Sequence, residues 1–168
     1  VCSSDLTNVV ERAKGCPYFR LKSSILCRNT KGKIITAAWK LFNQQGYENT
    51  TVEDILEEYE GVKTLLRGGG ITCTGGEPLT QIAFVTELFE AAKERGIHTC
   101  LDTSGATFRP DDAGTLSQFD RLIAATDLVM LDIKHIDPEA HQRLTGHDNR
   151  NILDFARFLS DRKVPVWI

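Results

Sequence analysis

One short stretch constrains the fold of this chain more than any other. Three glycines at 68–70 lead into the β-type segment Ile71-Thr72-Cys73-Thr74, which ends in Gly75-Gly76-Glu77-Pro78, and a helical pattern follows at once. Adjacent glycines at the carboxyl end of a strand let the backbone approach a ligand closely, because no Cβ intervenes. In parallel α/β folds, ligands bind at that end of the strands. The residues leave one alternative open, a tight strand-to-helix turn without a ligand.

Helical and strand patterns alternate along residues 51–168. Alternation of this kind implies right-handed βαβ crossovers and a parallel sheet of about four strands. We therefore predict an α/β fold. Apolar spacing and turn residues place helices at 51–66, 79–95, 112–124, 137–144 and 150–162, and strands at 69–74, 97–102, 127–133 and 164–168.

Capping residues mark the ends of several of these helices. Asn49 or Thr50 is expected to cap the first helix, and Asp111 the third. Gly96 is expected to end the second helix, because glycine adopts the left-handed conformation of a helix C-cap without strain.

Strand parity brings polar side chains to one rim of the sheet, because side chains alternate across a strand. One face of the third strand ends in Asp132 and Lys134, and its opposite face is wholly aliphatic. Asp102 occupies the corresponding end of the second strand. We expect both carboxylates to lie near Gly75 and Gly76, in a polar ring around one pocket.

Each polar residue also has a purely structural interpretation. Asp132 and Lys134 could form a simple ion pair at a strand end, worth about 0–1 kcal/mol if exposed. Asp102 could be a turn residue that bonds its own backbone, and this role is compatible with a place in the pocket.

The cysteines and histidines predict neither a disulfide framework nor a metal site. The five cysteines, at 2, 16, 27, 73 and 100, are odd in number and have no close pairs, which fits a reducing cytoplasm. Parity places Cys73 against the helices, and Cys100 is expected to be a small buried residue. The histidines lack metal-ligand spacing and are interpreted as surface or packing residues. No apolar run approaches the roughly 18 residues of a membrane span, and we see no signal peptide.

Residues 1–50 differ in character from the remainder. They carry eight Lys/Arg and three Asp/Glu, a net +5, whereas residues 51–168 carry twelve and twenty, a net −8. Residues of about 30–58, in particular the run from Thr30-Lys31-Gly32-Lys33 to Thr50-Thr51-Val52, resemble the start of a TetR-type helix-turn-helix DNA-binding domain, with helices over about 31–58. This resemblance gives the alternative function, a fragment of a TetR-like DNA-binding transcriptional regulator. However, no recognition helix follows Glu58, and the acidic remainder opposes phosphate binding. Nucleic acid is therefore not an expected partner.

A second resemblance covers about residues 51–168. It rests on Gly75-Gly76-Glu77-Pro78, on 98–105 (HTCLDTSG), on 126–134 (TDLVMLDIK), on 153–156 (LDFA) and on 166–168 (VWI). In this order the motifs resemble radical S-adenosylmethionine (radical SAM) enzymes, and among them the activases of glycyl radical enzymes, of the pyruvate formate-lyase activating type. The resemblance implies a partial parallel (β/α) barrel over 51–168, of which about four strands are present. Residues 1–50 are then expected to be a foreign helical or irregular segment, joined near Thr51 to a fragment of an activase.

The resemblance also implies a chemistry. Such enzymes use a 4Fe–4S cluster, reduced by a donor such as flavodoxin or ferredoxin, to cleave S-adenosylmethionine into a 5′-deoxyadenosyl radical. In the activases this radical removes a hydrogen from a backbone glycine of a partner glycyl radical enzyme. No side chain is assigned as catalytic, because the protein positions a cofactor that does the chemistry.

The family's binding positions carry over to six residues of this chain. Gly75, Gly76 and Glu77 would hold the methionine amino end of the cofactor. Asp132 and Lys134 would contact S-adenosylmethionine at the rim of the third strand. Asp102 would line the cofactor pocket or the partner's glycine loop.

One departure from the family bears on activity. The cluster cysteines of the family are spaced Cys-x3-Cys-x2-Cys, and no combination of the five cysteines here gives that spacing. We predict that the chain does not assemble the cluster and does not turn over, and we assign no metal ligand. A partial barrel is also expected to expose two sheet edges.

Overall fold

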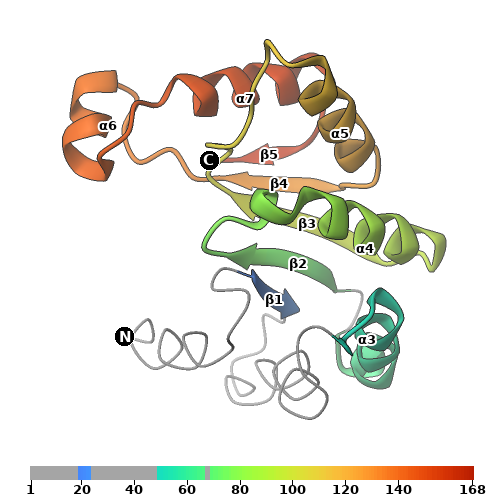
Figure 1. Cartoon of the computed structure of the whole chain (residues 1–168). Helices are drawn as coiled ribbons and strands as arrows, with labels where there is room; N and C mark the ends of the chain where they lie inside the picture. The colour runs from blue at the N-terminus through green and yellow to red at the C-terminus, as the bar shows by residue number, and fades with distance from the viewer. Residues whose placement is uncertain (1–18, 24–48, 67–68) are drawn as a thin grey trace.

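The computed structural model describes residues 19–23, 49–66 and 69–168, and its centre is one five-stranded sheet in the order β1-β2-β3-β4-β5 (Figure 1). Strands β2 to β5 run parallel to one another, as predicted from the alternating pattern. The strands are β1 (Phe19–Ser23), β2 (Gly70–Gly75), β3 (His98–Thr103), β4 (Leu128–Leu131) and β5 (Val166–Trp167).

The predicted helices are also present in the predicted order, with bounds that differ by a few residues. They are α3 (Val52–Leu66), the 3-10 turn η2 (Pro78–Gln81), α4 (Ile82–Glu94), α5 (Ala113–Ala124), α6 (Pro138–Thr145) and α7 (Arg150–Asp161). The helix predicted at 79–95 therefore begins as a 3-10 turn. Glu77 caps this turn by accepting a hydrogen bond from the Leu79 amide.

Two predicted helix caps are wrong by one or two residues. Asp112, not Asp111, caps α5, because its carboxylate accepts from the Gly114 amide. At the start of α3, the Thr51 hydroxyl accepts from the Asp54 amide, and the Asp54 carboxylate accepts from the Thr51 amide. This reciprocal capping box places the cap at Thr51 rather than Asn49 or Thr50. Gly96 ends α4 as predicted, with a φ of +67°.

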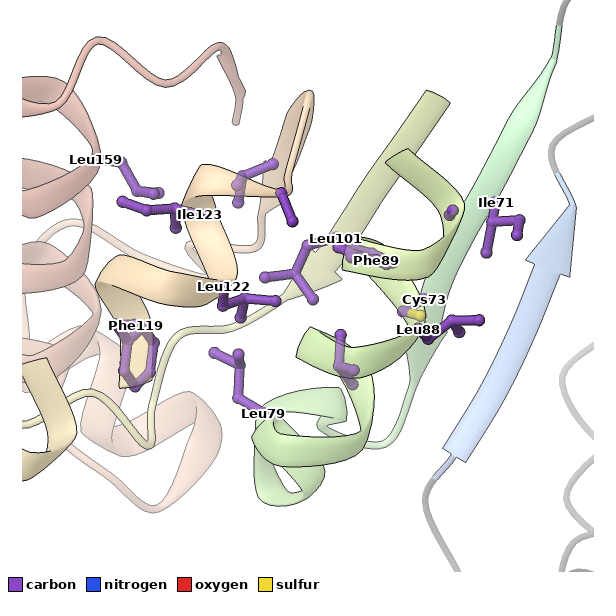
Figure 2. Close-up of a cluster of buried hydrophobic side chains, with 14 of the residues drawn as sticks. Ile71, Cys73, Leu79, Leu88, Phe89, Leu101, Phe119, Leu122, Ile123 and Leu159 are labelled. Carbon is purple, nitrogen blue, oxygen red and sulfur yellow. The ribbon is translucent and has the colours of Figure 1, made fainter. Parts of the chain in front are cut away.

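The core lies on the face of the sheet that the helices cover. Ile71, Cys73, Leu101 and Val129 point into it from β2, β3 and β4 and are at most 1% exposed. Figure 2 shows Leu101 between Phe89 of α4 and Leu122 of α5. Burial of each such Leu or Phe side chain stabilises the fold by about 1.5–3 kcal/mol. Parity therefore correctly placed Cys73 against the helices.

An aromatic cluster anchors the loop after β3. Phe108 in this loop packs on Phe119 of α5, with ring centroids 5.0 Å apart, and on Phe155 of α7 at 5.3 Å. Gly105, with a φ of +70°, lies so close that an added Cβ would be 2.5 Å from Cδ1 of Phe155. The loop that follows β3 is thereby held against the core.

Strand β1 was not predicted, and it moves one sheet edge from β2 to β1, so that the open sheet ends at two strands, β1 and β5. It pairs antiparallel with β2, from Phe19 opposite Gly75 to Ser23 opposite Ile71. The edge of β2 is therefore covered. The sequence signal was the alternation of Phe19-Arg20-Leu21-Lys22-Ser23, which is typical of a short strand.

The predicted TetR-like helices lie largely outside the described residues. Of the range 31–58, the structure describes residues 49–58, most of them in the first half of α3. The proposed boundary near residue 50 stays a prediction. No helix in the described ranges is both long and apolar enough to cross a membrane.

Candidate functional site

The predicted polar residues gather where β2, β3 and β4 end. The Thr74 hydroxyl, at the end of β2, donates a 2.6 Å hydrogen bond to the Asp102 carboxylate on β3. The Asp132 amide, just after β4, donates to the Thr103 carbonyl at 2.9 Å. These bonds join the ends of three adjacent strands into one rim, as strand parity predicted.

Gly75 and Gly76 form the exposed turn on this rim. Gly75 ends β2 with a φ of +149°, a conformation that side-chain-bearing residues rarely adopt. No donor from the described part of the chain reaches the carbonyl of Gly76. The turn therefore presents the Gly76 carbonyl as a backbone acceptor at the mouth of the parallel strands.

Glu77 is bound within the chain on every side. Its Oε1 accepts from the Leu79 amide at 3.1 Å and from the Thr103 hydroxyl at 2.5 Å. Its Oε2 accepts from the amide and the hydroxyl of Ser104, at 3.1 and 2.5 Å. The carboxylate thus fastens the turn after β2 to the end of β3.

Asp132 and Lys134 form an ion pair with each other. Their side chains are 47% and 55% exposed, so the pair contributes little to stability. The ion-pair interpretation of these residues is confirmed. A role in ligand binding remains compatible with it, because both charged ends face solvent at the rim.

The face of the sheet opposite the helices carries polar side chains between the rim and the strand centres. Thr72 and Thr74 of β2 lie on this face, in register with Cys100 and Asp102 of β3. Met130 of β4, opposite Asp102, is 36% exposed although it is a central strand residue. Thr72, Thr74 and Cys100 are buried, so this face is exposed at Met130 of β4 rather than along β2 and β3, whereas the opposite face is packed with helices.

Three site residues were missed by sequence reasoning: Thr74, Thr103 and Ser104. Thr74 could have been found from parity, because it shares a face with Thr72 at the end of β2. Thr103 and Ser104 follow Asp102 directly, but their bonds to Glu77 span 26 and 27 residues of sequence. Nothing local in the chain signals that contact.

The described cysteines do not form a metal centre. Cys73 and Cys100 lie on opposite faces of neighbouring strands, and both are buried. Burial raises the thiol pKa of both residues, although the Thr72 hydroxyl counteracts the effect at Cys100. In the described ranges no group of three or more His, Cys, Asp or Glu side chains could hold a metal ion. A buried thiol with a raised pKa is a poor cluster ligand, because the ligand form is the thiolate.

We expect Cys73 and Cys100 to resist alkylation in the folded chain. At pH 8 a raised pKa leaves little thiolate, and burial blocks access, so iodoacetamide should label both at least about tenfold more slowly than after unfolding in urea. Peptide mass mapping would measure each site separately. Rapid labelling of Cys73 in the native protein would contradict the packing described here.

The histidine interpretation is confirmed for His141, which is 3% exposed. Its Nδ1 lies 2.8 Å from the His147 carbonyl and 3.1 Å from the Thr145 hydroxyl, so it acts as a packing residue of α6.

A cavity of about 190 Å³ lies beside α6 and α7 and includes none of the predicted site residues. It is lined by Pro138, Asp148, Asn149, Arg150, Leu153 and Arg157.

A parallel α/β sheet with a glycine turn and acidic residues at its carboxyl rim defines the class of protein. A sequence model of the Radical SAM superfamily matches residues 27–168, which is most of the chain. The chain belongs to the radical SAM superfamily, and its four parallel strands form part of the barrel of that family.

Individual relatives indicate which kind of radical SAM enzyme the chain resembles. The pyruvate formate-lyase-activating enzymes of Staphylococcus aureus strains USA300 and NCTC 8325 / PS 47 are each 46% identical over 132 residues, which cover 77% of this chain and 51% of the relative. The chain therefore spans about half the length of the curated relatives it matches. A solved domain of the pyruvate-formate lyase-activating enzyme from Bacteroides vulgatus ATCC 8482 is 27% identical with a TM-score of 0.50, covering 59% of this chain and 57% of that one.

The comparisons give no support to the alternative of a TetR-like regulator. The superfamily match begins at residue 27 and so includes the range 30–58 on which that alternative rested.

Proposed function

We propose that this chain carries the S-adenosylmethionine-binding part of an activase that generates a glycyl radical on a partner enzyme of the pyruvate formate-lyase type. The observation that carries the proposal is the joining of the three strand ends, which places Gly75-Gly76-Glu77, Asp102 and Asp132 on one rim. The names of the relatives support the choice of partner. We further propose a reducing cytoplasm as the compartment, in agreement with the odd number of cysteines.

The rim fits the charged end of the cofactor. Exposed backbone carbonyls of the glycine turn suit an ammonium group, which is a donor without acceptors. Lys134 offers an exposed cation for a carboxylate, and Asp132 and Asp102 offer carboxylate acceptors at neighbouring strand ends. In the family, bound S-adenosylmethionine supplies the radical chemistry. The part that we assign to this chain is to bind it and orient it at the polar rim of the sheet.

The described residues do not fit the iron–sulfur cluster. No described set of side chains could hold a metal, and the five cysteines of the sequence lack the family spacing. We therefore propose that this chain does not turn over by itself. The electron donor, flavodoxin or ferredoxin, is proposed for the family's complete enzyme.

We expect saturable binding of S-adenosylmethionine to the chain, measured by isothermal titration calorimetry. A Lys134→Ala variant should bind about tenfold more weakly, which is the scale of one charge-assisted hydrogen bond. Arg121→Ala is the matched control. Its guanidinium is also exposed and paired, with Glu90 on the helix-covered side, and its loss should leave binding unchanged. A wild-type chain that binds neither S-adenosylmethionine nor S-adenosylhomocysteine would overturn the proposal.

A further inference from the structure

The acceptor capacity of the Glu77 carboxylate is filled by the chain itself. An ionised carboxylate offers about four lone-pair sites. Glu77 receives four donors, two on each oxygen: the Leu79 amide, the Thr103 hydroxyl, and the amide and hydroxyl of Ser104. A fifth donor, such as the ammonium group of a ligand, would have to displace one of them.

The two hydroxyl donors are themselves fixed in orientation. The Thr103 hydroxyl accepts from the Gly105 amide at 2.9 Å, and the Ser104 hydroxyl accepts from the Ala106 amide at 3.3 Å. A hydroxyl has one hydrogen, so a hydroxyl that accepts from an amide directs that hydrogen elsewhere, here to Glu77. The network is thus satisfied throughout, and hydrogen bonds of this charge-assisted kind are strong.

The network also leads from the glycine turn to the core. Glu77 follows Gly75 and Gly76 directly, and Gly105 follows Ser104 and packs against Phe155 of the aromatic cluster. The Glu77 carboxylate therefore fixes the position of the exposed turn relative to the aromatic cluster of the core.

We infer that Glu77, Thr103 and Ser104 are positioning residues: the Glu77 carboxylate does not contact the ligand but holds the carbonyls of the Gly75-Gly76 turn in place to receive an ammonium group. The inference rests on the proposed function. It differs from a direct role of Glu77, because it extends the site to Thr103 and Ser104, whose hydroxyl groups bond to Glu77 and to amides of their own loop.

Ser104→Ala is the variant that separates the two roles. If Glu77 acts through position, removal of the Ser104 hydroxyl should weaken binding of S-adenosylhomocysteine about tenfold. If Glu77 contacted the ligand directly, the same variant would bind as tightly as the wild type, and this result would overturn the inference.

A double-mutant cycle with Glu77→Gln gives a second, independent readout. This substitution replaces one carboxylate oxygen with an NH2 group, which is a donor and would face at least one of the existing donors. The Glu77→Gln variant is therefore also expected to bind S-adenosylhomocysteine weakly. If both residues act as a unit, the double variant should bind about as weakly as Glu77→Gln alone. If the double variant instead lost binding by the product of the two single fold-changes, the two residues would act independently, which would contradict the inference.

Asp127→Asn is the control for a general loss of stability. Asp127 also links two elements through its carboxylate, accepting from the Thr99 amide at 2.9 Å and from Lys93 Nζ at 2.6 Å, but it precedes β4 and lies at the opposite end of the strands. This variant should bind S-adenosylhomocysteine like the wild type at a temperature where circular dichroism shows all variants folded.

Amide hydrogen exchange tests, without a ligand, whether Ser104 holds the glycine turn in place through Glu77. A peptide covering residues 75–81 should exchange faster in Ser104→Ala than in the wild type and should be unchanged in Asp127→Asn. Unchanged exchange in Ser104→Ala would overturn the inference even if Glu77→Gln fails to fold. A wild type that binds no ligand, combined with faster exchange in Ser104→Ala, would instead overturn the proposed function and leave the structural coupling in place.

Discussion

A Gly70→Ala variant is expected to lose about 3 kcal/mol or more of its free energy of unfolding. An added Cβ at Gly70 would lie 2.0 Å from the carbonyl oxygen of His98 and 2.7 Å from its carbonyl carbon. Both atoms belong to the backbone of β3, and Gly70 pairs directly with His98 in the parallel ladder. The clash cannot be relieved by a rotamer change, so β2 and β3 must separate where their pairing begins.

Gly61→Ala provides the matched control for this prediction. Gly61 lies inside α3, and nothing lies within 4 Å of an added Cβ there. Because alanine is the better helix former, this variant should be more stable than the wild type by about 0.5–1 kcal/mol. Urea denaturation of both variants measures the difference. Equal stability of Gly70→Ala and the wild type would show that β2 and β3 do not pair as described.

The same glycine run shows why the fold was largely predictable from sequence. Gly68-Gly69-Gly70, the alternating strand and helix patterns, and Gly96 after α4 are all local signals, and each fixes an element or its end. Parallel pairing followed from the alternation, because a helix between two strands returns the chain to the end of the sheet at which the first strand began. Parity then placed Cys73 in the core and Asp102 and Asp132 at the rim.

The errors arose where local signals compete or where long-range contacts decide. Thr51 and Asp112 lie beside other capping residues, and only the three-dimensional hydrogen bonds show which one is used. Strand β1 depends on pairing with β2, about fifty residues away in sequence, whose antiparallel direction no local pattern encodes.

Glu77 shows the same limit at the site. Its place after two glycines indicated a ligand site, but its bonds to Thr103 and Ser104 exist only because β2 and β3 are neighbours. The sequence therefore located the rim, whereas the structure was needed to show which atoms of the rim remain available for a ligand.

The positions of the cysteines predict that the chain does not assemble a 4Fe–4S cluster. A 4Fe–4S cluster requires thiolates that converge on one site. Cys73 and Cys100 fail this requirement, because they lie on opposite faces of the sheet and burial raises the pKa of both thiols. The remaining cysteines, Cys2, Cys16 and Cys27, are spaced by 13 and 10 intervening residues rather than by three and two.

We therefore expect anaerobic reconstitution with iron and sulfide to leave the chain with much less than one cluster per molecule. The matched control is the triple variant Cys2→Ser/Cys16→Ser/Cys27→Ser, which retains both buried cysteines and hence the core. Iron and sulfide analysis and the visible charge-transfer absorption should be the same for this variant and the wild type after gel filtration. Stoichiometric iron and sulfide in the wild type, lost in the triple variant, would show that these three thiols support a cluster despite their spacing and would contradict the prediction.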